Sequence, residues 1–229
     1  IAVLALAVVT AGAAGALVHQ YTFEGGTADD AVGGLNPSGT SNVAINSDDA
    51  IQGAYSASFD GVAGYIEYGS SAFDTSAFSV TMWIKPGSPT HTLMALVSNK
   101  TGGNDDGFAL NVNAYGTSDG TLWVETGDPD ESTTNTAFSL PGQVQHGQPR
   151  EWQHLAYTID RAAGEARLYY QGVDVTGSDS DIWTDFSVDG TWRMGLYMDG
   201  GYRLDGRLDD LRIYDEVLSE EDIQVLANN

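Results

Sequence analysis

Short apolar segments separated by turn-forming residues fill the chain from residue 21 onward, and this pattern constrains the fold more than any other feature. Sequences such as NDDG, SDG and AAGE stand between the segments and are typical of hairpins and loops. So many short strands without intervening helices predict one antiparallel β-sandwich or jelly roll. Ten such segments are SASF (56–59), YIEY (65–68), FSVTMWIK (78–85), TLMALVS (92–98), FALNVN (108–113), TLWVE (121–125), WQHLAYTID (152–160), ARLYY (166–170), RMGLYM (193–198) and LDDLRIY (208–214).

One short helix is predicted near the end of the chain. Ser219 stands before an acidic first turn, with Asp222 three residues later, and apolar residues follow. This resembles a capping box, in which a serine hydroxyl accepts a hydrogen bond from the first turn. We expect the helix to pack on the edge of the sandwich.

The charge of the chain narrows its partners and its surroundings. The net charge is −23, with 32 acidic residues against nine basic ones. Nucleic-acid binding is not expected, because phosphate recognition needs clustered Lys and Arg. The acidic residues are dispersed among aromatic ones, which indicates that they coat a folded surface. Such a surface is expected of a halophilic protein that works in brine, and the alternative is an ordinary acidic secreted protein. There are no cysteines, so neither disulfides nor thiolate metal sites form.

The first 18 residues are apolar and rich in Ala and Gly. As a helix they would span about 27 Å, and the small residues favour close helix–helix packing. The segment resembles the N-terminal helix of archaeal type IV pilins, which predicts a processed chain whose helix joins a filament core. A membrane anchor and a retained signal sequence or expression remnant are the alternatives. The residues expected in that core are Val3, Leu4, Leu6, Val8, Val9, Gly12, Gly15 and Leu17.

Several stretches, taken in order over about residues 21–227, resemble the laminin-G-like, concanavalin A-like jelly roll. They are YTFEGGTADDAVGGLN (21–36), YSASFDGVAGYIEY (55–68), FSVTMWIKP (78–86), EWQHLAYTID (151–160), ARLYYQGVDV (166–175) and LDGRLDDLRIYDEVLSEEDI (204–223). The jelly-roll resemblance implies a mainly β fold, which the apolar N-terminal helix would precede. Together the two features predict two parts, a hydrophobic helix over 1–20 and a jelly-roll domain over 21–229 that ends in the short helix.

The fold is shared by lectins, carbohydrate-binding modules, adhesion domains and some glycosidases, so the function has to come from the residues. Retaining glucanases of this fold carry E-x-D-x-x-E on one strand, and that pattern is absent. Glu125 instead begins ETGDPDE, which reads as a turn-rich loop. We expect His154 to be structural and His19, His91 and His146 to lack a carboxylate partner. The chain is therefore predicted not to be an enzyme.

A structural calcium ion is implied by the resemblance, because members of this fold class often join their first and last strands with one. The family role falls on Glu24 after the opening strand and on Asp209 and Asp210 in the closing strand. Oxygens near Asn36 and Asp60 would complete the ligand shell, since calcium takes six to eight oxygen ligands. The alternative is that these carboxylates are solvated or paired with Arg207 or Arg212.

Sugar binding would use exposed aromatic rings as stacking platforms, and Trp183 and Tyr202 in polar loops are the candidates. Trp83, Trp152 and Trp192 are expected in the core. Asn99, in the sequence NKT, is a candidate glycosylation site.

Together these features predict a structural subunit of an extracellular, type IV pilus-like filament that sits in the membrane before assembly. Its self-associated helices would form the core, and its lectin-like domain would contact cell-surface glycans. The alternative is a secreted or membrane-anchored carbohydrate-binding protein.

Overall fold

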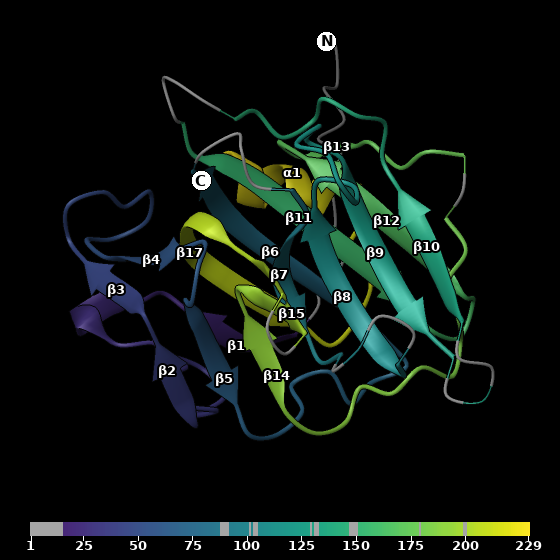
Figure 1. Cartoon of the computed structure of the whole chain (residues 1–229), viewed down its shortest axis with the longest axis horizontal. Helices are drawn as coiled ribbons and strands as arrows, with labels where there is room; N and C mark the ends of the chain where they lie inside the picture. The colour runs from purple at the N-terminus through teal and green to yellow at the C-terminus, as the bar shows by residue number, and fades with distance from the viewer. Residues whose placement is uncertain are drawn as a thin grey trace, which may run out of the picture.

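The structure is a computed structural model that describes residues 16–87, 92–100, 102, 105–128, 130, 133–146, 151–178, 180–198 and 201–229. Two antiparallel sheets lie one behind the other in it (Figure 1). This arrangement confirms the mainly β, sandwich-like fold that the alternating segments predict.

The larger sheet, sheet A, has eight strands. They are β1 (Leu17–Tyr21), β3 (Val43–Asn46), β4 (Ser56–Asp60), β6 (Ala77–Pro86), β11 (Gln153–Asp160), β12 (Glu165–Tyr170), β13 (Val173–Asp174) and β17 (Asp205–Tyr214). Their order is β13-β12-β11-β6-β17-β4-β3, and β1 also pairs with β17. The two ends of the chain therefore meet in one sheet.

The smaller sheet, sheet B, has seven strands in the order β10-β9-β8-β7-β14-β5-β2. They are β2 (Gly39–Ser41), β5 (Tyr65–Tyr68), β7 (Met94–Ser98), β8 (Gly107–Val112), β9 (Leu122–Gly127), β10 (Thr134–Phe138) and β14 (Trp192–Met194). A separate hairpin of β15 (Leu196–Met198) and β16 (Gly201–Arg203) follows β14. The segment RMGLYM, expected as one strand, is thus divided at Gly195, whose φ of 79° turns the chain out of sheet B.

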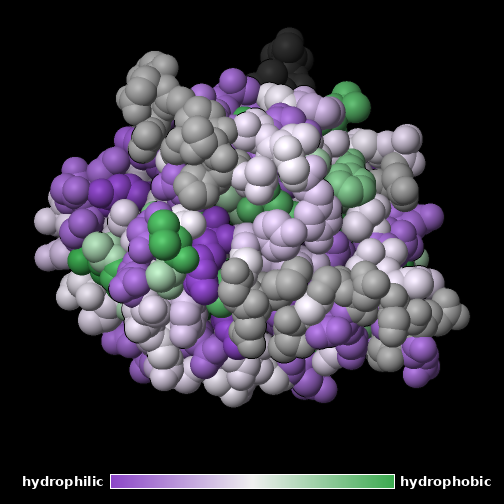
Figure 2. Space-filling view, in the orientation of Figure 1, coloured by the Kyte–Doolittle hydropathy of each residue, from purple (hydrophilic) through white to green (hydrophobic). Residues whose placement is uncertain are grey.

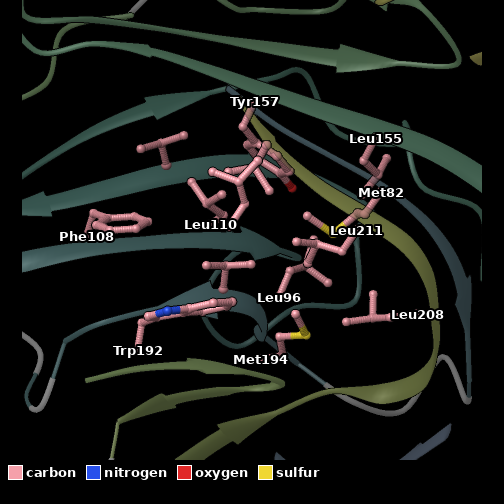
Figure 3. Close-up of a cluster of buried hydrophobic side chains, with 14 of the residues drawn as sticks. Met82, Leu96, Phe108, Leu110, Leu155, Tyr157, Trp192, Met194, Leu208 and Leu211 are labelled. Atoms are coloured by element: carbon pink, nitrogen blue, oxygen red, sulfur yellow. The ribbon is translucent and has the colours of Figure 1, made fainter. Parts of the chain in front are cut away.

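The core fills the space between the sheets because alternate residues of each strand point inward. Phe78, Val80, Met82 and Ile84 of β6 all belong to it. In Figure 3, Leu155 of β11 in sheet A lies across the core from Leu110 of β8 and Leu96 of β7, both in sheet B. Trp192 is fully buried and stacks on Tyr68 with ring centroids 4.3 Å apart, which confirms its expected core position. Trp83 and Trp152 are only half-buried.

The predicted C-terminal helix is α1 (Glu220–Ala227). The backbone N–H of Asp222 donates to the Ser219 hydroxyl at 3.2 Å, and this hydroxyl donates to the Asp222 carboxylate at 2.5 Å. Ile223 packs the helix against Ala156 and Tyr169 on the outer face of sheet A. In the described part of the chain, no helix has the length and apolar character needed to span a bilayer.

The start of the described chain departs from the expected helix. Residues 17–20, the end of the predicted 1–20 helix, belong to β1, so the helix prediction is wrong for these residues. The division into a 1–20 segment and a 21–229 domain stays a prediction. Pairing of Leu17 with Tyr214 in β17 outweighs the local apolar pattern. The other predicted core positions of the filament, Val3, Leu4, Leu6, Val8, Val9, Gly12 and Gly15, lie outside the described residues.

Asp30 fixes the loop that follows β1. Its carboxylate accepts hydrogen bonds from the backbone N–H groups of Gln20, Val32 and Leu35 at 3.0 Å each, and His19 Nδ1 lies 2.6 Å from it. Burial alone would raise the pKa of Asp30, but these backbone donors and His19 lower it to about 2. His19 therefore does have a carboxylate partner, contrary to the expectation from sequence.

Candidate glycan-binding face

The outer face of sheet B carries a cluster of aromatic and charged side chains. In β9, Leu122 and Val124 enter the core, so the alternating Trp123 and Glu125 point to the other side of the sheet. Glu125 therefore lies in a strand, and its expected place in a turn-rich loop is wrong. We define the sheet B face by Lys100, Tyr115, Trp123, Glu125, Tyr197 and Tyr202.

A buried ion pair forms the base of the sheet B face. Lys100 Nζ lies 2.8 Å from Glu125 Oε1, and the two side chains are 0% and 3% exposed. The hydroxyl of Tyr197 donates to the same carboxylate oxygen, and the Tyr115 hydroxyl lies 3.3 Å from Glu125 Oε2. Burial, reinforced by the Glu125 charge, raises the pKa of Tyr197 and raises that of Tyr115 to about 12. Both tyrosines are therefore neutral donors at physiological pH.

Aromatic rings cover this ion pair. Tyr202 meets Tyr115 and Tyr197 edge to face, with ring centroids 5.5 and 5.7 Å apart. Trp123 is buried between Tyr115 and a stacked Phe138. Tyr115 is still 49% exposed and Tyr202 is half-buried, so these two rings offer the accessible aromatic surface. Tyr202 has a φ of 52°, a left-handed conformation that is costly for an aromatic residue and is typical of functional positions.

A hollow of about 320 Å³ adjoins the sheet B face at Tyr202 and is called the Arg203 hollow. Its lining includes Val62, Leu93, Tyr202 and Arg203. The Arg203 guanidinium lies over the Tyr65 ring at 5.7 Å. Figure 2 shows that hydrophobic residues on the visible face form small separate spots among hydrophilic ones, which suits a polar ligand.

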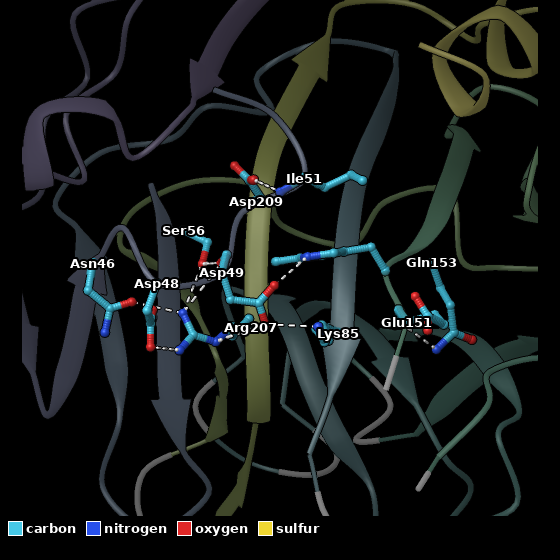
Figure 4. A network of polar contacts seen from close by, with 11 residues as sticks. Asn46, Asp48, Asp49, Ile51, Ser56, Lys85, Glu151, Gln153, Arg207 and Asp209 are labelled. Carbon is cyan, nitrogen blue, oxygen red and sulfur yellow. Dashed lines mark hydrogen bonds and ion pairs between the residues drawn. The ribbon is translucent and has the colours of Figure 1, made fainter. Parts of the chain in front are cut away.

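A second hollow, of about 220 Å³, opens on the outer face of sheet A and is called the Arg207 hollow. Arg207 lies 2.9 Å from Asp48 and donates to Asn46 at 2.8 Å, while Lys85 lies 2.8 Å from Asp49 (Figure 4). The indole N–H of Trp152 also donates to Asp49, at 3.1 Å. Both cations of this hollow are thus neutralised by aspartates of one loop.

Glu24 and Asp209, the leading calcium candidates, hold the loop at residues 51–55. Glu24 lies in the 3-10 helix η1 (Glu24–Gly26), and its Oε1 accepts from the N–H groups of Ala54 and Tyr55 at 2.7 and 2.9 Å. Asp209 Oδ2 accepts from Ile51 and Gln52 at 2.9 and 3.0 Å. The two carboxylates therefore accept hydrogen bonds from neighbouring turns of one loop.

Asp209 is fully buried, and within the described ranges its second oxygen, Oδ1, has no hydrogen-bond partner. Burial, with the neighbouring Asp210, raises the pKa of Asp209 to about 6 despite the backbone N–H donors. A bound cation would satisfy such an oxygen. Among the described residues, however, no group of three His, Asp or Glu side chains is placed to hold a metal, so carbonyl oxygens would be needed.

The remaining predicted ligands have other partners. Asp210 pairs with Arg212 at 2.7 Å and accepts from Gln20. Asn36 accepts from the Asp30 N–H, and Asp60 caps its own turn by accepting from Val62, Ala63 and Gly64. The structure thus brings Glu24 and Asp209 to one loop, whereas these three side chains serve local turns and strand contacts.

Trp183 and Asn99, two other predicted site residues, make structural contacts. Trp183 packs against the main core, and its backbone N–H donates to Thr126. Tyr202, the other predicted stacking residue, belongs to the sheet B face. Asn99 donates from Nδ2 to the Ser187 carbonyl at 2.9 Å and accepts from the Phe108 N–H at 2.7 Å. Glycosylation of Asn99 stays a prediction, and it would require the bond to Ser187 to break.

The histidines occupy different surroundings. His154 is buried on the outer face of sheet A, where it touches the Trp83 ring, and burial lowers its pKa to about 4. His146 Nε2 lies 2.8 Å from Asn113 Oδ1. His91 lies outside the described residues. That the chain is not an enzyme stays a prediction.

Sequence reasoning missed Lys100, Tyr115, Glu125 and Tyr197 as functional candidates. A charged residue two positions from Trp123 in an otherwise apolar strand was the available signal, because period two places both on one face. Their meeting with Lys100, Tyr115 and Tyr197 depends on pairing of distant strands, which no local pattern shows.

Solved structures share this fold at low sequence identity. Domain 4 of AbnA, a GH43 extracellular arabinanase from Geobacillus stearothermophilus solved with arabinotriose, is 20% identical, with a TM-score of 0.70 over 93% of this chain and 99% of that one. The binding domain of Paraclostridial Mosquitocidal Protein 1 is 16% identical, with a TM-score of 0.69 over 93% of this chain. This chain spans about half of that domain, at 52%.

A third structure, the CBM40 of the Ruminococcus gnavus IT-sialidase bound to α2,3-sialyllactose, is 19% identical, with a TM-score of 0.52 over 66% of this chain and 82% of that one. At these identities the likeness shows the fold alone. No curated protein sequence gives a significant match. Residues 60–224 match the family Laminin_G_3. Since the match covers most of the sequence, the chain belongs to the concanavalin A-like lectin/glucanases superfamily.

Proposed function

We propose that the chain is a glycan-binding module whose ligand lies on the sheet B face, against Tyr115 and Tyr202. The observation that carries this proposal is a pair of accessible aromatic rings fixed above a buried ion pair. Sugar rings stack on aromatic side chains, and a hydrogen-bonded tyrosine presents its ring in one orientation. The sugar complexes of the arabinanase domain and of the CBM40, both of this fold, support it.

The ion pair provides the rigidity that such a site needs. Glu125 orients the Tyr115 hydroxyl, and Tyr202 packs on Tyr115 and Tyr197. Rings held in place before binding lose little conformational freedom when the ligand arrives. The partly exposed ring edges then supply both apolar contact and hydroxyl groups.

A glycan array tests the proposal. The wild type should bind at least one glycan, and Tyr115→Ala or Tyr202→Ala should weaken that binding about tenfold or more, the effect of about 1.4 kcal/mol. Tyr115→Phe keeps the ring and should lose less. Trp152→Leu, on the outer face of sheet A, is the matched aromatic control and should bind like the wild type. Binding that survives both alanine variants would place the ligand elsewhere.

Calcium at Asp209 and Glu24 is a second part of the proposal. The buried oxygen of Asp209 without a partner among the described residues fits a cation, which would join the closing strand to the loop held by Glu24. Calcium at about 100 times its Kd should add about 2.7 kcal/mol to the free energy of unfolding, and a chelator should remove it. Asp209→Asn should abolish this response, and Asp60→Asn should keep it. If neither calcium nor a chelator changes the free energy of unfolding of the wild type, the calcium site is refuted.

An extracellular filament remains a prediction for residues 1–16, together with its archaeal, membrane and brine context. It is supported by their apolar, Ala-rich composition and by their direct attachment to β1. Negative-stain microscopy of native material decides it: helical filaments would support the role, whereas detergent-bound monomers would exclude it.

A further inference from the structure

From the Arg203 hollow we infer that the module recognises an acidic sugar, with the Arg203 guanidinium binding the sugar carboxylate beside Tyr202. The inference rests on the proposed function and names the chemical class of its ligand. In a chain with 32 acidic residues and nine basic ones, a cation without an acidic partner is unusual.

Every other described lysine and arginine has an oxygen partner. Five lie within 3.3 Å of a carboxylate, Lys100 is buried against Glu125, and Arg161 donates to the Thr75 and Phe186 carbonyls. The five are Lys85, Arg167, Arg193, Arg207 and Arg212. In the described ranges Arg203 has no ion pair, and its Nη1 is buried with no hydrogen-bond partner.

An unpaired, partly desolvated guanidinium is costly, and a carboxylate is the group that offsets this cost best. Arg binds carboxylates through two parallel N–H···O bonds, which add both affinity and orientation. Stacking over Tyr65 holds the guanidinium at 5.7 Å from the ring, and the residue as a whole is partly exposed although its Nη1 is buried. Arg203 is therefore positioned to accept an anion.

The hollow matches the rest of a sugar ring. Tyr202 stands next to Arg203 in β16 and lines the same hollow, while Val62 and Leu93 add apolar contact. At 74% exposed, Val62 is the most exposed large hydrophobic residue described. A pyranose with a carboxylate could thus place its charge on Arg203 and its apolar face against these side chains. The hollow continues into the sheet B face through Tyr202.

Because the protein is strongly acidic overall, a preference for an acidic sugar over its neutral ester would point to a specific binding group. A net charge of −23 repels anionic ligands at long range, so the protein as a whole disfavours an acidic sugar. A carboxylate preference then requires a local group that stabilises the anion, and loss of that preference in Arg203→Gln identifies the group as Arg203. The Arg207 hollow offers the internal comparison, because its Arg207 and Lys85 are already bound to Asp48 and Asp49.

The experiment compares acids with their neutral esters by calorimetry at 0.15 M salt. The probes are trigalacturonate and α2,3-sialyllactose, each alongside its methyl ester. The wild type should bind at least one acid about tenfold or more tightly than its ester, and Arg203→Gln should reduce that ratio to about one. Arg203→Lys should keep part of it, and Arg207→Gln all of it. Circular dichroism melts confirm that each variant is folded.

Equal binding of acid and ester by the wild type, or an unchanged ratio in Arg203→Gln, would overturn the inference. If glycans on the array still bind and depend on Tyr115 and Tyr202, the proposed function survives that outcome. If no glycan binds at all, both fail. Binding of only one acid identifies the sugar and supports the inference.

Discussion

Two places on the outer faces of the sandwich, the Arg207 hollow on sheet A and the sheet B face, hold their cations in different ways. On sheet A, Lys85 and Arg207 are neutralised in a half-exposed hollow by aspartates of the same loop. On sheet B, Lys100 and Glu125 are buried beneath tyrosines, and Arg203, next to Tyr202 in β16, has no acidic partner in the described chain. In this acidic protein, the exposed cations Lys85 and Arg207 are neutralised by aspartates close by. A buried ion pair, and a guanidinium without an acidic partner in the described chain, therefore indicate that the sheet B side has another role.

The largest expected effect comes from breaking the buried pair. Lys100→Met leaves Glu125 buried without its cation, which should cost about 3–5 kcal/mol in the free energy of unfolding. The equivalent Lys85→Met change should cost about 1 kcal/mol or less, because Lys85 and Asp49 are 21% and 32% exposed. Denaturant unfolding measures both. Equal losses for the two variants would remove the contrast between the faces.

A rescue experiment sharpens the same point. Lys100→Met combined with Glu125→Leu removes both charges and should recover much of the loss, since the cost of a broken pair is the unpaired buried charge. A double variant as unstable as the sum of the singles would mean that packing, rather than charge, dominates the site.

Acid should weaken the sheet A side. His154 has a pKa of about 4 when folded, against about 6.5 when unfolded, because burial disfavours its charged form. The unfolded state therefore binds the proton first, and stability falls as pH drops from about 6.5 toward 4. Between pH 7 and pH 5 the wild type should lose about 2 kcal/mol more than His154→Phe.

The comparison with His154→Phe is needed because Asp209 acts in the opposite direction. Its folded pKa of about 6 lies above the ordinary value of 3.8, so the folded state gains protons, and relative stability, as pH falls. Asp209 is present in both proteins, and the difference between them isolates His154. Parallel pH profiles for the two would show that His154 does not titrate between these pH values.

The smallest effect concerns salt. At about 1 M salt the Debye length is about 3 Å, so the coupling energy between Lys85 and Asp49, about 0.5 kcal/mol in dilute buffer, should fall toward zero. The coupling between Lys100 and Glu125 should change little, because solvent ions do not reach a buried pair. Double-mutant cycles at the two salt concentrations measure both values. A salt-sensitive Lys100–Glu125 coupling would contradict its burial.

The strands were predictable where alternation was strong and where both neighbours were apolar. The sequence FSVTMWIK became β6 and LDDLRIY became part of β17, because Phe78, Val80, Leu208 and Ile213 need a shared core. The motif resemblance placed these strands in order. The strand at Leu17 and Val18 was not predicted, since it forms through pairing with β17 near the other end of the chain.

The candidate site was less predictable than the fold. Tyr202 was found because an aromatic residue in a polar loop stands out locally. Arg203, its neighbour, gave no signal, because the lack of an acidic partner depends on where all the aspartates and glutamates fold. Trp183 looked equivalent to Tyr202 in sequence, yet it packs against the core. Its exposure depended on segments far away in the chain.

The most direct test of the central claim is glycan binding by matched variants of the two faces. The wild type and Trp152→Leu should bind the same glycans on an array, and Tyr115→Ala and Tyr202→Ala should lose about tenfold or more in affinity. That result would place recognition on the sheet B face. Loss of binding in Trp152→Leu, with the tyrosine variants unaffected, would contradict the account and move the site to sheet A.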